Sequence, residues 1–344
     1  MPVTAIWVTA PLFPIKNLWR TLLAAGVLLA AAGPVAAETY TVTIQDLDIG
    51  VVASGATGDT VFRVDPGTNA ITTVSGSGTR VGSSGAGRAV VTVACAAAAP
   101  GECNKQVNVK IAVAGSPTLR IRSISRLLFA MGTAVLGGSP IGQPQGSFTI
   151  QAVGPNASKT FFIGADLTIG GDDSGLGTGN ATSGFSVFVA PVPATPTQGA
   201  IGQGKAKVLR SITLTKTADL VFGRVTLPPS GSGTVTIDAT TGVRSTTGGV
   251  FSLGSPTPGR ATFDVGGEGG QVFSITVPAT FQMTGTATPL TVTTTNSAGG
   301  TGVLSASLGS AGTFVLGVGG SFTLASSSPT GNYTGSFLVT VAYN

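Results

Sequence analysis

The chain has 344 residues, with 18 Lys and Arg against 13 Asp and Glu, and a formal net charge of +5. Charged residues make up only 9%, histidine is absent, and glycine alone contributes 52 residues. So weak and dispersed a positive charge argues against a nucleic-acid-binding surface. The lack of histidine excludes Ser-His-Asp and Cys-His catalysis and histidine-based zinc sites. We therefore expect no enzymatic activity, no cofactor and no bound metal.

The first 37 residues have the form of a secretory signal peptide. Lys16 and Arg20 precede an apolar run from Leu22 to Ala32, and Val35-Ala36-Ala37 offers the small residues that a signal peptidase requires. We predict cleavage after Ala37 and before Glu38. No later segment reaches the roughly 20 apolar residues that a membrane helix needs. The sequence thus predicts a bacterial protein exported to the periplasm, the cell surface or the medium, without a membrane span in the mature chain.

Beyond the leader, short runs of residues alternate between apolar and polar or small side chains. Clusters of Gly, Ser, Pro and Asp separate these runs at intervals of about 8–12 residues. This pattern is typical of an antiparallel β-sandwich, in which one face of each strand is buried. One segment is ambiguous, because Ile124, Leu127, Leu128 and Met131 follow helical spacing and fit either a short amphipathic helix or a buried strand.

The two cysteines, Cys95 and Cys103, flank a short loop between two runs that alternate like strands, 90–93 and 107–111. In an exported protein such a pair predicts a disulfide, here at the neck of a hairpin. A loop of this size stabilises the fold by roughly 2–3 kcal/mol in the chain-entropy model. The spacing is not C-x-x-C, which argues against a redox role.

Two further groups of charged residues could form sites. Arg120, Arg122 and Arg126 are the one local concentration of positive charge, and we interpret them as a solvated sheet face or protected edge, with binding of an anionic surface glycan as the alternative. Asp172 and Asp173 lie in a glycine-rich loop that could offer oxygens to calcium. The second half of the chain has no acid at the equivalent place, so a solvated turn is the simpler interpretation.

The second half of the chain repeats the first. Asp46–Val52 recurs as Asp219–Val225, and Gly179–Ala190 matches Gly331–Ala342 at seven of twelve positions. Because the beginning, middle and end align in order, one domain has been duplicated.

A proline-rich segment separates the two copies. Residues 191–205 hold three prolines within six residues and predict a stiff, extended linker. We therefore predict a first, more divergent domain at 38–190 and a second domain at 206–344.

The last fourteen residues hold the most specific pattern in the chain. A glycine stands at their start, apolar residues alternate, and a tyrosine is penultimate. This segment resembles the C-terminal strand of chaperone–usher pilins and fimbrial adhesins, including the spore-coat-U-like group. In those proteins a periplasmic chaperone grips the strand by strand addition. The resemblance implies an interaction strand formed by Gly331, Phe337, Val339, Val341 and Tyr343. A self-complete sandwich would show the same alternation, so that interpretation stays open.

Both copies also resemble DUF4402, a bacterial domain family of unknown function. Phe222-Gly223, a glycine-rich middle and the G-x-Y-x-G…V-x-V-x-Y ending carry the resemblance in the second copy. The first copy departs from it, with Ile49-Gly50 for Phe-Gly and Pro191 at the place of the final tyrosine. The resemblance implies immunoglobulin-like antiparallel β-sandwich domains, here two in tandem, and no activity.

Two functional hypotheses follow. In the first, the protein is a structural or adhesive surface subunit, such as the tip of a fimbria, whose partners are a periplasmic chaperone, an usher or other pilus subunits. Residues 40–44 are then the first strand of the first domain and no free segment remains to be donated. In the second, the protein is a free-standing secreted or periplasmic binding module of two complete sandwiches, with surface glycan as its ligand.

Overall fold

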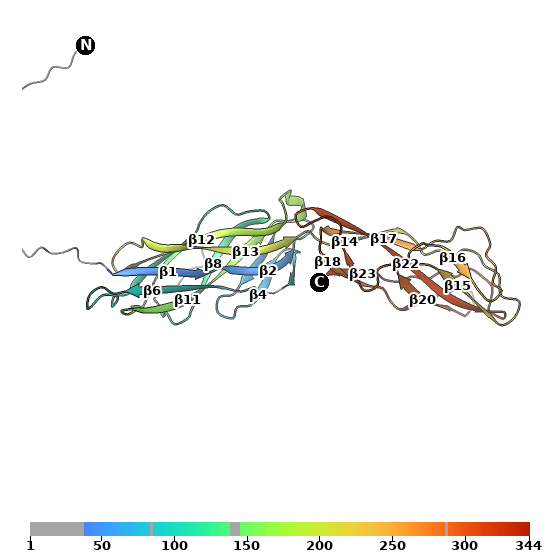
Figure 1. Ribbon diagram of the computed structural model, residues 1–344, viewed down its shortest axis with the longest axis horizontal. Helices are drawn as coiled ribbons and strands as arrows, with labels where there is room; N and C mark the ends of the chain where they lie inside the picture. Colours follow the sequence, from blue (N-terminus) through green and yellow to red (C-terminus); the bar gives the residue numbers. More distant parts are fainter. Residues whose placement is uncertain (1–37, 83–84, 138–144, 286–287) are drawn as a thin grey trace, which may run out of the picture. The chain divides into compact units, whose positions relative to one another are not determined.

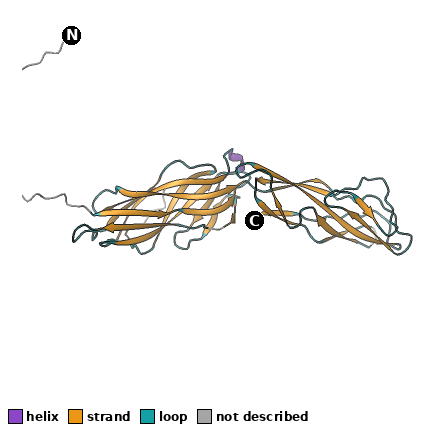
Figure 2. Ribbon diagram, viewed as in Figure 1, coloured by secondary structure: helices purple, strands orange, loops and turns teal. Residues whose placement is uncertain are grey.

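The computed structural model describes residues 38–82, 85–137, 145–285 and 288–344 and shows an all-β protein (Figures 1 and 2). Its one helical element in this range is a single 3₁₀ turn, η1 (Asp172–Ser174). The predicted leader, up to and including Ala37, lies outside the described residues. Within them, no helix has the length and apolar character needed to cross a bilayer.

Strands β1 to β13 form two sheets that enclose one core, and we call them the first domain. The smaller sheet has the order β1 (Thr39–Gln45), β6 (Ala89–Ala96), β11 (Ala157–Ile169), β3 (Thr60–Val64) and β4 (Ile71–Ser75), with β8 (Ile121–Met131) also paired to β11. The larger has the order β5 (Thr79–Gly82), β2 (Leu47–Ala53), β13 (Gln198–Leu209), β12 (Gly179–Pro191), β7 (Val107–Val113), β10 (Gln145–Ile150) and β9 (Leu136–Gly137). Alternate residues of β3 and β6 are buried, as the period of two predicts.

Strands β14 to β23 form the second domain. Its larger sheet runs β14 (Thr213–Ala218), β17 (Ala261–Glu268), β22 (Ala311–Ala325), β15 (Ser232–Ile237) and β16 (Arg244–Thr246), with β20 (Leu290–Asn296) between β22 and β19 (Thr280–Met283). This order matches β1, β6, β11, β3, β4 and β8 strand for strand, as a duplication predicts. The other sheet holds only β21 (Thr301–Val303), β18 (Val272–Thr276) and β23 (Thr340–Tyr343).

The predicted linker is wrong in its position. Residues 198–209, which overlap the predicted linker 191–205, form strand β13, which pairs with β12 over its length and also with β2. The prolines lie in and beside the turn between β12 and β13, where the missing proline N–H groups cost no ladder hydrogen bond. The change from one pair of sheets to the other therefore falls between Leu209 and Thr213.

The ambiguous segment after Arg120 is strand β8, and its spacing comes from irregular pairing. Asp166 lies opposite Arg126 while Leu167 lies opposite Ile124, so Ser125 is an extra residue on β8. Such a bulge keeps Ile124 and Leu127 on the buried face although they are three residues apart. A β-bulge thus reproduces the spacing of a helical face.

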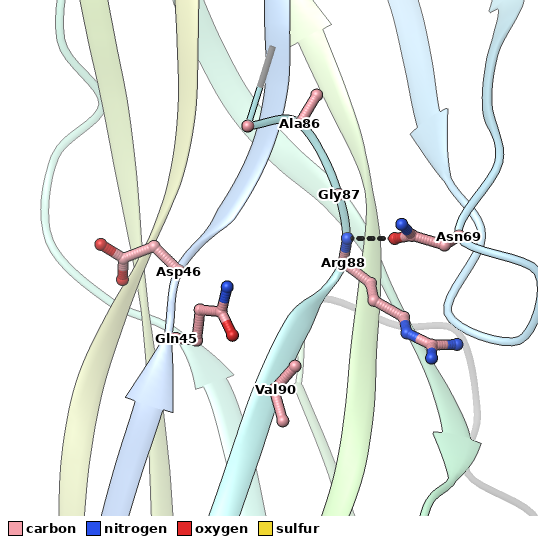
Figure 3. A pocket seen from close by; sticks show the side chains of 8 residues that line it. Gln45, Asp46, Asn69, Ala86, Gly87, Arg88 and Val90 are labelled. Atoms are coloured by element: carbon pink, nitrogen blue, oxygen red, sulfur yellow. Dashed lines mark hydrogen bonds between the residues drawn. The ribbon is translucent and has the colours of Figure 1, made fainter. Parts of the chain in front are cut away.

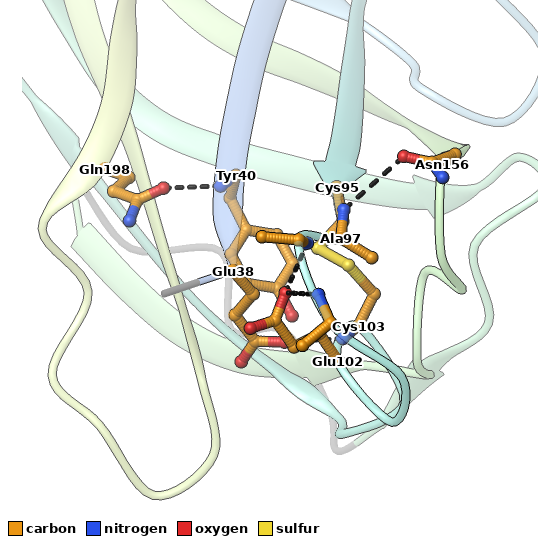
Figure 4. Close-up of a disulfide and its surroundings, with 10 residues drawn as sticks. Glu38, Tyr40, Cys95, Ala97, Glu102, Cys103, Asn156 and Gln198 are labelled. Carbon is orange, nitrogen blue, oxygen red and sulfur yellow. Dashed lines mark hydrogen bonds between the residues drawn. A yellow bond between two sulfur atoms is a disulfide. The ribbon is translucent and has the colours of Figure 1, made fainter. Parts of the chain in front are cut away.

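The predicted disulfide between Cys95 and Cys103 is confirmed, with the two Cα atoms 6.0 Å apart (Figure 4). The predicted hairpin around it is wrong, because β6 belongs to one sheet and β7 to the other. The disulfide therefore closes the crossover between the two layers. Beside it, the Glu38 carboxylate accepts a hydrogen bond from the Cys103 N–H at 2.5 Å (Figure 4).

A turn fastened by aspartate and arginine occurs in both domains. Asp65 accepts hydrogen bonds from the N–H groups of Gly67 and Thr68, and Arg88 donates to the carbonyl of Gly67 in the same turn. In the second domain Asp238 accepts from the N–H groups of Thr240 and Thr241, and the Arg260 guanidinium lies at the carbonyls of the same turn. Arg88 and Arg260 each stand in a Gly-Arg-Ala sequence, at 87–89 and 259–261, so this repeated motif has a structural role.

Candidate functional site

The feature that distinguishes the two domains is strand β13. It lies between β2 and β12, parallel to β2 and antiparallel to β12, and so joins two halves of the larger sheet. Its inward positions carry small residues up to Val208, which is fully buried. Ala206 and Val208 belong to the single hydrophobic core of the first domain.

A carboxylate at the edge of the first domain also holds β13. Asp46 accepts a hydrogen bond from the Gln203 N–H at 2.8 Å and pairs with the Lys205 ammonium at 2.6 Å. Because Asp46 lies just before β2, it fixes the register of β13 against that strand. Asp46 therefore belongs to the binding surface for β13.

The second domain has no counterpart of β13 among its described residues, which are 213–285 and 288–344. The sheet that β13 would complete is in two parts: β21, β18 and β23 form one part. The other is the segment equivalent to β2, which makes only isolated bridges, from Val221 to Gly259 and from Val225 to Ser252. Residues 335–339 belong to no strand, whereas their equivalents 183–187 in β12 all pair with β13 and pair with β7 from Phe185 on.

Apolar residues along these two edges are less buried than their equivalents in the first domain. Phe185 is 1% exposed, whereas Phe337 is half-buried. Leu47 is 1% exposed, whereas Leu220 is half-buried. The core of the second domain is also divided into two clusters, with Leu220 packed against both. We call the two edges, 219–225 and 335–343, the acceptor edges.

The carboxylate that matches Asp46 is exposed. Asp219 occupies the same place in the repeated motif, but its side chain is 73% exposed and forms an ion pair with Lys216, three residues earlier. An exposed pair of this kind contributes little to stability. Asp219 is therefore available to the group that Lys205 supplies in the first domain.

The predicted C-terminal interaction strand lies along one acceptor edge. Val339 is buried, Phe337 and Val341 are half-buried, and Gly331 is exposed at the start of the segment. The whole predicted strand is not regular, because only Thr340–Tyr343 form β23, paired with β18. Phe337 instead packs against Phe281, with ring centroids 5.0 Å apart.

The hydroxyl group of Tyr343 forms two hydrogen bonds with the main chain. Its hydroxyl donates to the Arg210 carbonyl at 3.0 Å and accepts from the Glu268 N–H at 2.7 Å. Burial raises the pKa of Tyr343 to about 12. Glu268, fully buried, pairs with the Arg210 guanidinium at 3.0 Å. The side chain of Tyr343 therefore anchors the end of β23, and the backbone edge of that strand is the part that can pair further.

The arginine group does not form one solvated face, so that interpretation is wrong for Arg120. Its side chain is 4% exposed, pairs with Asp172 and donates to the Leu176 carbonyl at 3.0 Å. Arg122 pairs with Asp59 at 2.9 Å. Asp172 also accepts hydrogen bonds from Ser54 and Ser211, and these lower its pKa although burial raises it. These contacts occupy the Asp172 carboxylate, and the arginines do not converge on a ligand.

A pocket of about 180 Å³ lies beside the turn described above, lined by Gln45, Asp46, Asn69, Gly85, Ala86, Gly87, Arg88 and Val90 (Figure 3). The side chains of Asp46 and Arg88 point to opposite sides (Figure 3). Arg88 lies 3.5 Å from the ring centroid of Phe162, and its N–H donates to Asn69. The polar groups that line the pocket are thus engaged in contacts within the protein, and we assign no ligand to this pocket.

Comparison with known families identifies the second domain. Residues 212–343 match the model of DUF4402, described as a domain of unknown function. The second domain thus matches DUF4402 over nearly its whole length, and we call it the DUF4402 domain. The match ends at the residue that closes β23, so both acceptor edges lie inside the DUF4402 domain.

Two other comparisons add no function. No curated protein matches the chain. Among solved structures, the chain is similar to one described as a chaperone–tip adhesin complex that is vital for synergistic activation of CFA/I fimbriae biogenesis. The identity is 9%, the alignment covers 89% of this chain and 84% of that chain, and the TM-score is 0.24.

Sequence reasoning missed β13 and therefore the acceptor edges as a pair. The inward residues of β13 from Ala200 to Ala206 are Gly and Ala, so this stretch has no apolar alternation. The available signal was the repeated aspartate, because Asp46 and Asp219 head the same motif and Lys205, which pairs with Asp46, follows the first copy.

Proposed function

We propose that this protein is a non-catalytic, exported surface subunit whose DUF4402 domain accepts a β-strand from a separate polypeptide. The observation that supports the proposal is the difference between the two domains at β13. The first domain includes a strand between β2 and β12, and the second has the same flanking segments without that strand in its described residues. Unpaired strand edges bind extended segments through main-chain hydrogen bonds.

The occupant is a strand and not a small molecule, because the matching place in the first domain is occupied by β13. That strand pairs with β12 over nearly its whole length and with β2 from Gly204 to Leu209. A segment in the same place in the second domain would cover Phe337 and Leu220 and join the two core clusters. Complete burial of an apolar side chain contributes roughly 1.5–3 kcal/mol, and each of these half-buried side chains would gain about half of that.

A position at the tip of an assembled fibre fits the first strand of the protein. Strand β1 is paired with β6 over its seven residues. It is therefore a part of the first domain, and among the described residues no other N-terminal segment could be donated to a next subunit. The proposed role is that of a subunit that receives a strand, caps an assembly and takes part in adhesion at the surface.

The experiment is refolding of the secreted chain, residues 38–344, from guanidinium with and without a synthetic peptide copying β13, residues 198–209. We expect the peptide to elute together with the protein on gel filtration, which is what we call retention. We also expect slower amide exchange in 220–225 and 335–341 when the peptide is present. The first domain already contains β13 and serves as the internal control. Cooperative refolding of both domains without peptide, and no peptide retained, would instead support the free-standing binding module.

A further inference from the structure

We propose that the strand accepted by the DUF4402 domain carries a glycine opposite Phe337 and a lysine or arginine three residues later, beside Asp219. This inference rests on the proposed function and specifies the partner strand. It comes from placing β13 in the second domain by the register that it has in the first. Gly202 lies opposite Phe185, and Lys205 is the residue that pairs with Asp46.

The glycine follows from the space between two apolar side chains. A Cβ atom added at Gly202 would lie 2.7 Å from Cζ of Phe185 and 2.7 Å from Cγ2 of Ile44. Carbon atoms pack at about 3.5–4.0 Å, so no larger residue fits without a shift of these side chains.

The second domain keeps the phenylalanine of this pair. Phe337 is the equivalent of Phe185 in the repeat. At the register of Ile44 the second domain has Lys216, because Ile44 lies opposite Val91, two residues after Ala89, and Lys216 lies opposite Phe263, two residues after the matching Ala261. Because the Phe185 ring alone leaves no room for a Cβ atom at Gly202, a strand in this place must present glycine to Phe337.

The basic residue follows from the charge at the other edge. Asp46 and Asp219 head the same seven-residue motif, and Asp46 pairs with Lys205 at 2.6 Å. In the second domain Asp219 lies at an exposed edge and pairs with Lys216, itself 59% exposed. A cation on the incoming strand replaces that weak local pair with one that fixes register. The spacing of the two features is that of Gly202 and Lys205.

The glycine is tested with labelled variants of the 198–209 peptide, refolded with the chain of residues 38–344. We expect Gly202→Leu to weaken retention at least tenfold. Gln203→Leu is the matched control, because it adds the same side chain at the neighbouring outward position, and it should change retention less than twofold. The acceptor variant Phe337→Ala should restore binding of the Gly202→Leu peptide.

The basic residue is tested by charge exchange. The Lys205→Glu peptide should bind the chain about two- to fivefold more weakly, since exposed pairs are modest in energy, and the Asp219→Lys chain should prefer that peptide. Raising the salt to 1 M should remove both differences, because screening acts on exposed pairs.

The outcomes separate this inference from the proposed function. If no peptide of any sequence is retained, the DUF4402 domain does not accept a strand and the proposed function fails. If the peptides are retained equally whatever stands at 202 and 205, the function stands and the glycine and lysine requirements are wrong. Rescue by Phe337→Ala, seen only with the Gly202→Leu peptide, supports the register.

Discussion

The two domains have matching strand orders in one sheet and differ in the other. In the first domain one strand, β13, joins β2 to β12 and the core is a single cluster. In the second domain the equivalent segments are present, the joining strand is not found among the described residues, and the core forms two clusters. This difference indicates that whether the apolar core of a sandwich forms one cluster can depend on a strand that contributes little apolar surface of its own.

That conclusion follows from the composition of β13. Its inward residues from Ala200 to Ala206 are small, so its own side chains bury little area. What the strand supplies is hydrogen bonding to two edges and a cover over large neighbours such as Phe185. An edge left without such a strand exposes both backbone groups and apolar side chains, which is a template for pairing with another chain.

The largest effect is expected from making the first domain resemble the second. Val208→Asp places a charge at a fully buried position of β13. We expect a loss of about 4–5 kcal/mol in the free energy of unfolding of the first domain, because an unpaired buried charge is among the costliest substitutions. Urea unfolding followed by hydrogen exchange and mass spectrometry reports each domain separately. Ile201→Asp, at an outward position of β13 that is 70% exposed, is the control; an equal loss there would contradict a core role for β13.

The next effect compares two equivalent phenylalanines. Phe185→Ala should destabilise the first domain by about 3–4 kcal/mol, since the side chain is 1% exposed. Phe337→Ala should cost the second domain about 1 kcal/mol, because its ring is only half-buried. Adding the 198–209 peptide should raise the second value towards the first. Equal losses without peptide would show that the acceptor edges are already covered.

A smaller effect is expected from the disulfide, which belongs to one domain only. Both cysteines lie in the first domain. Replacing Cys95 and Cys103 with alanine should lower its free energy of unfolding by about 2–3 kcal/mol, because the unfolded chain gains loop entropy. The second domain is the control in the same molecule, and any equal loss there would mean that the two domains unfold together.

The sequence was sufficient for features that depend on local pattern or on order. Alternation predicted the all-β fold, the cysteine spacing predicted the disulfide, and the C-terminal motif predicted DUF4402 membership, all of which are confirmed. Predictions of features that depend on contacts between residues far apart in the chain were wrong or missing. Arg120 is buried because Asp172, 52 residues later, neutralises it. Strand β13 was missed because glycine and alanine give no periodic signal, although β12 and β2 make it a strand.

The smallest effect tests what the domains share. Hydrogen bonds from the Thr68 N–H hold the pKa of Asp65 below its usual value, and those from the Thr241 N–H do the same for Asp238. A carboxyl with a lowered folded pKa adds stability above its unfolded pKa, and this is lost as pH falls through the folded value. Acidification below about pH 4 should thus weaken both domains. Asp65→Asn should flatten this dependence in the first domain and Asp238→Asn in the second, measured by exchange at pH 2–5. If one substitution flattened both, or neither, the repeated turn would not be the common element that the two domains keep.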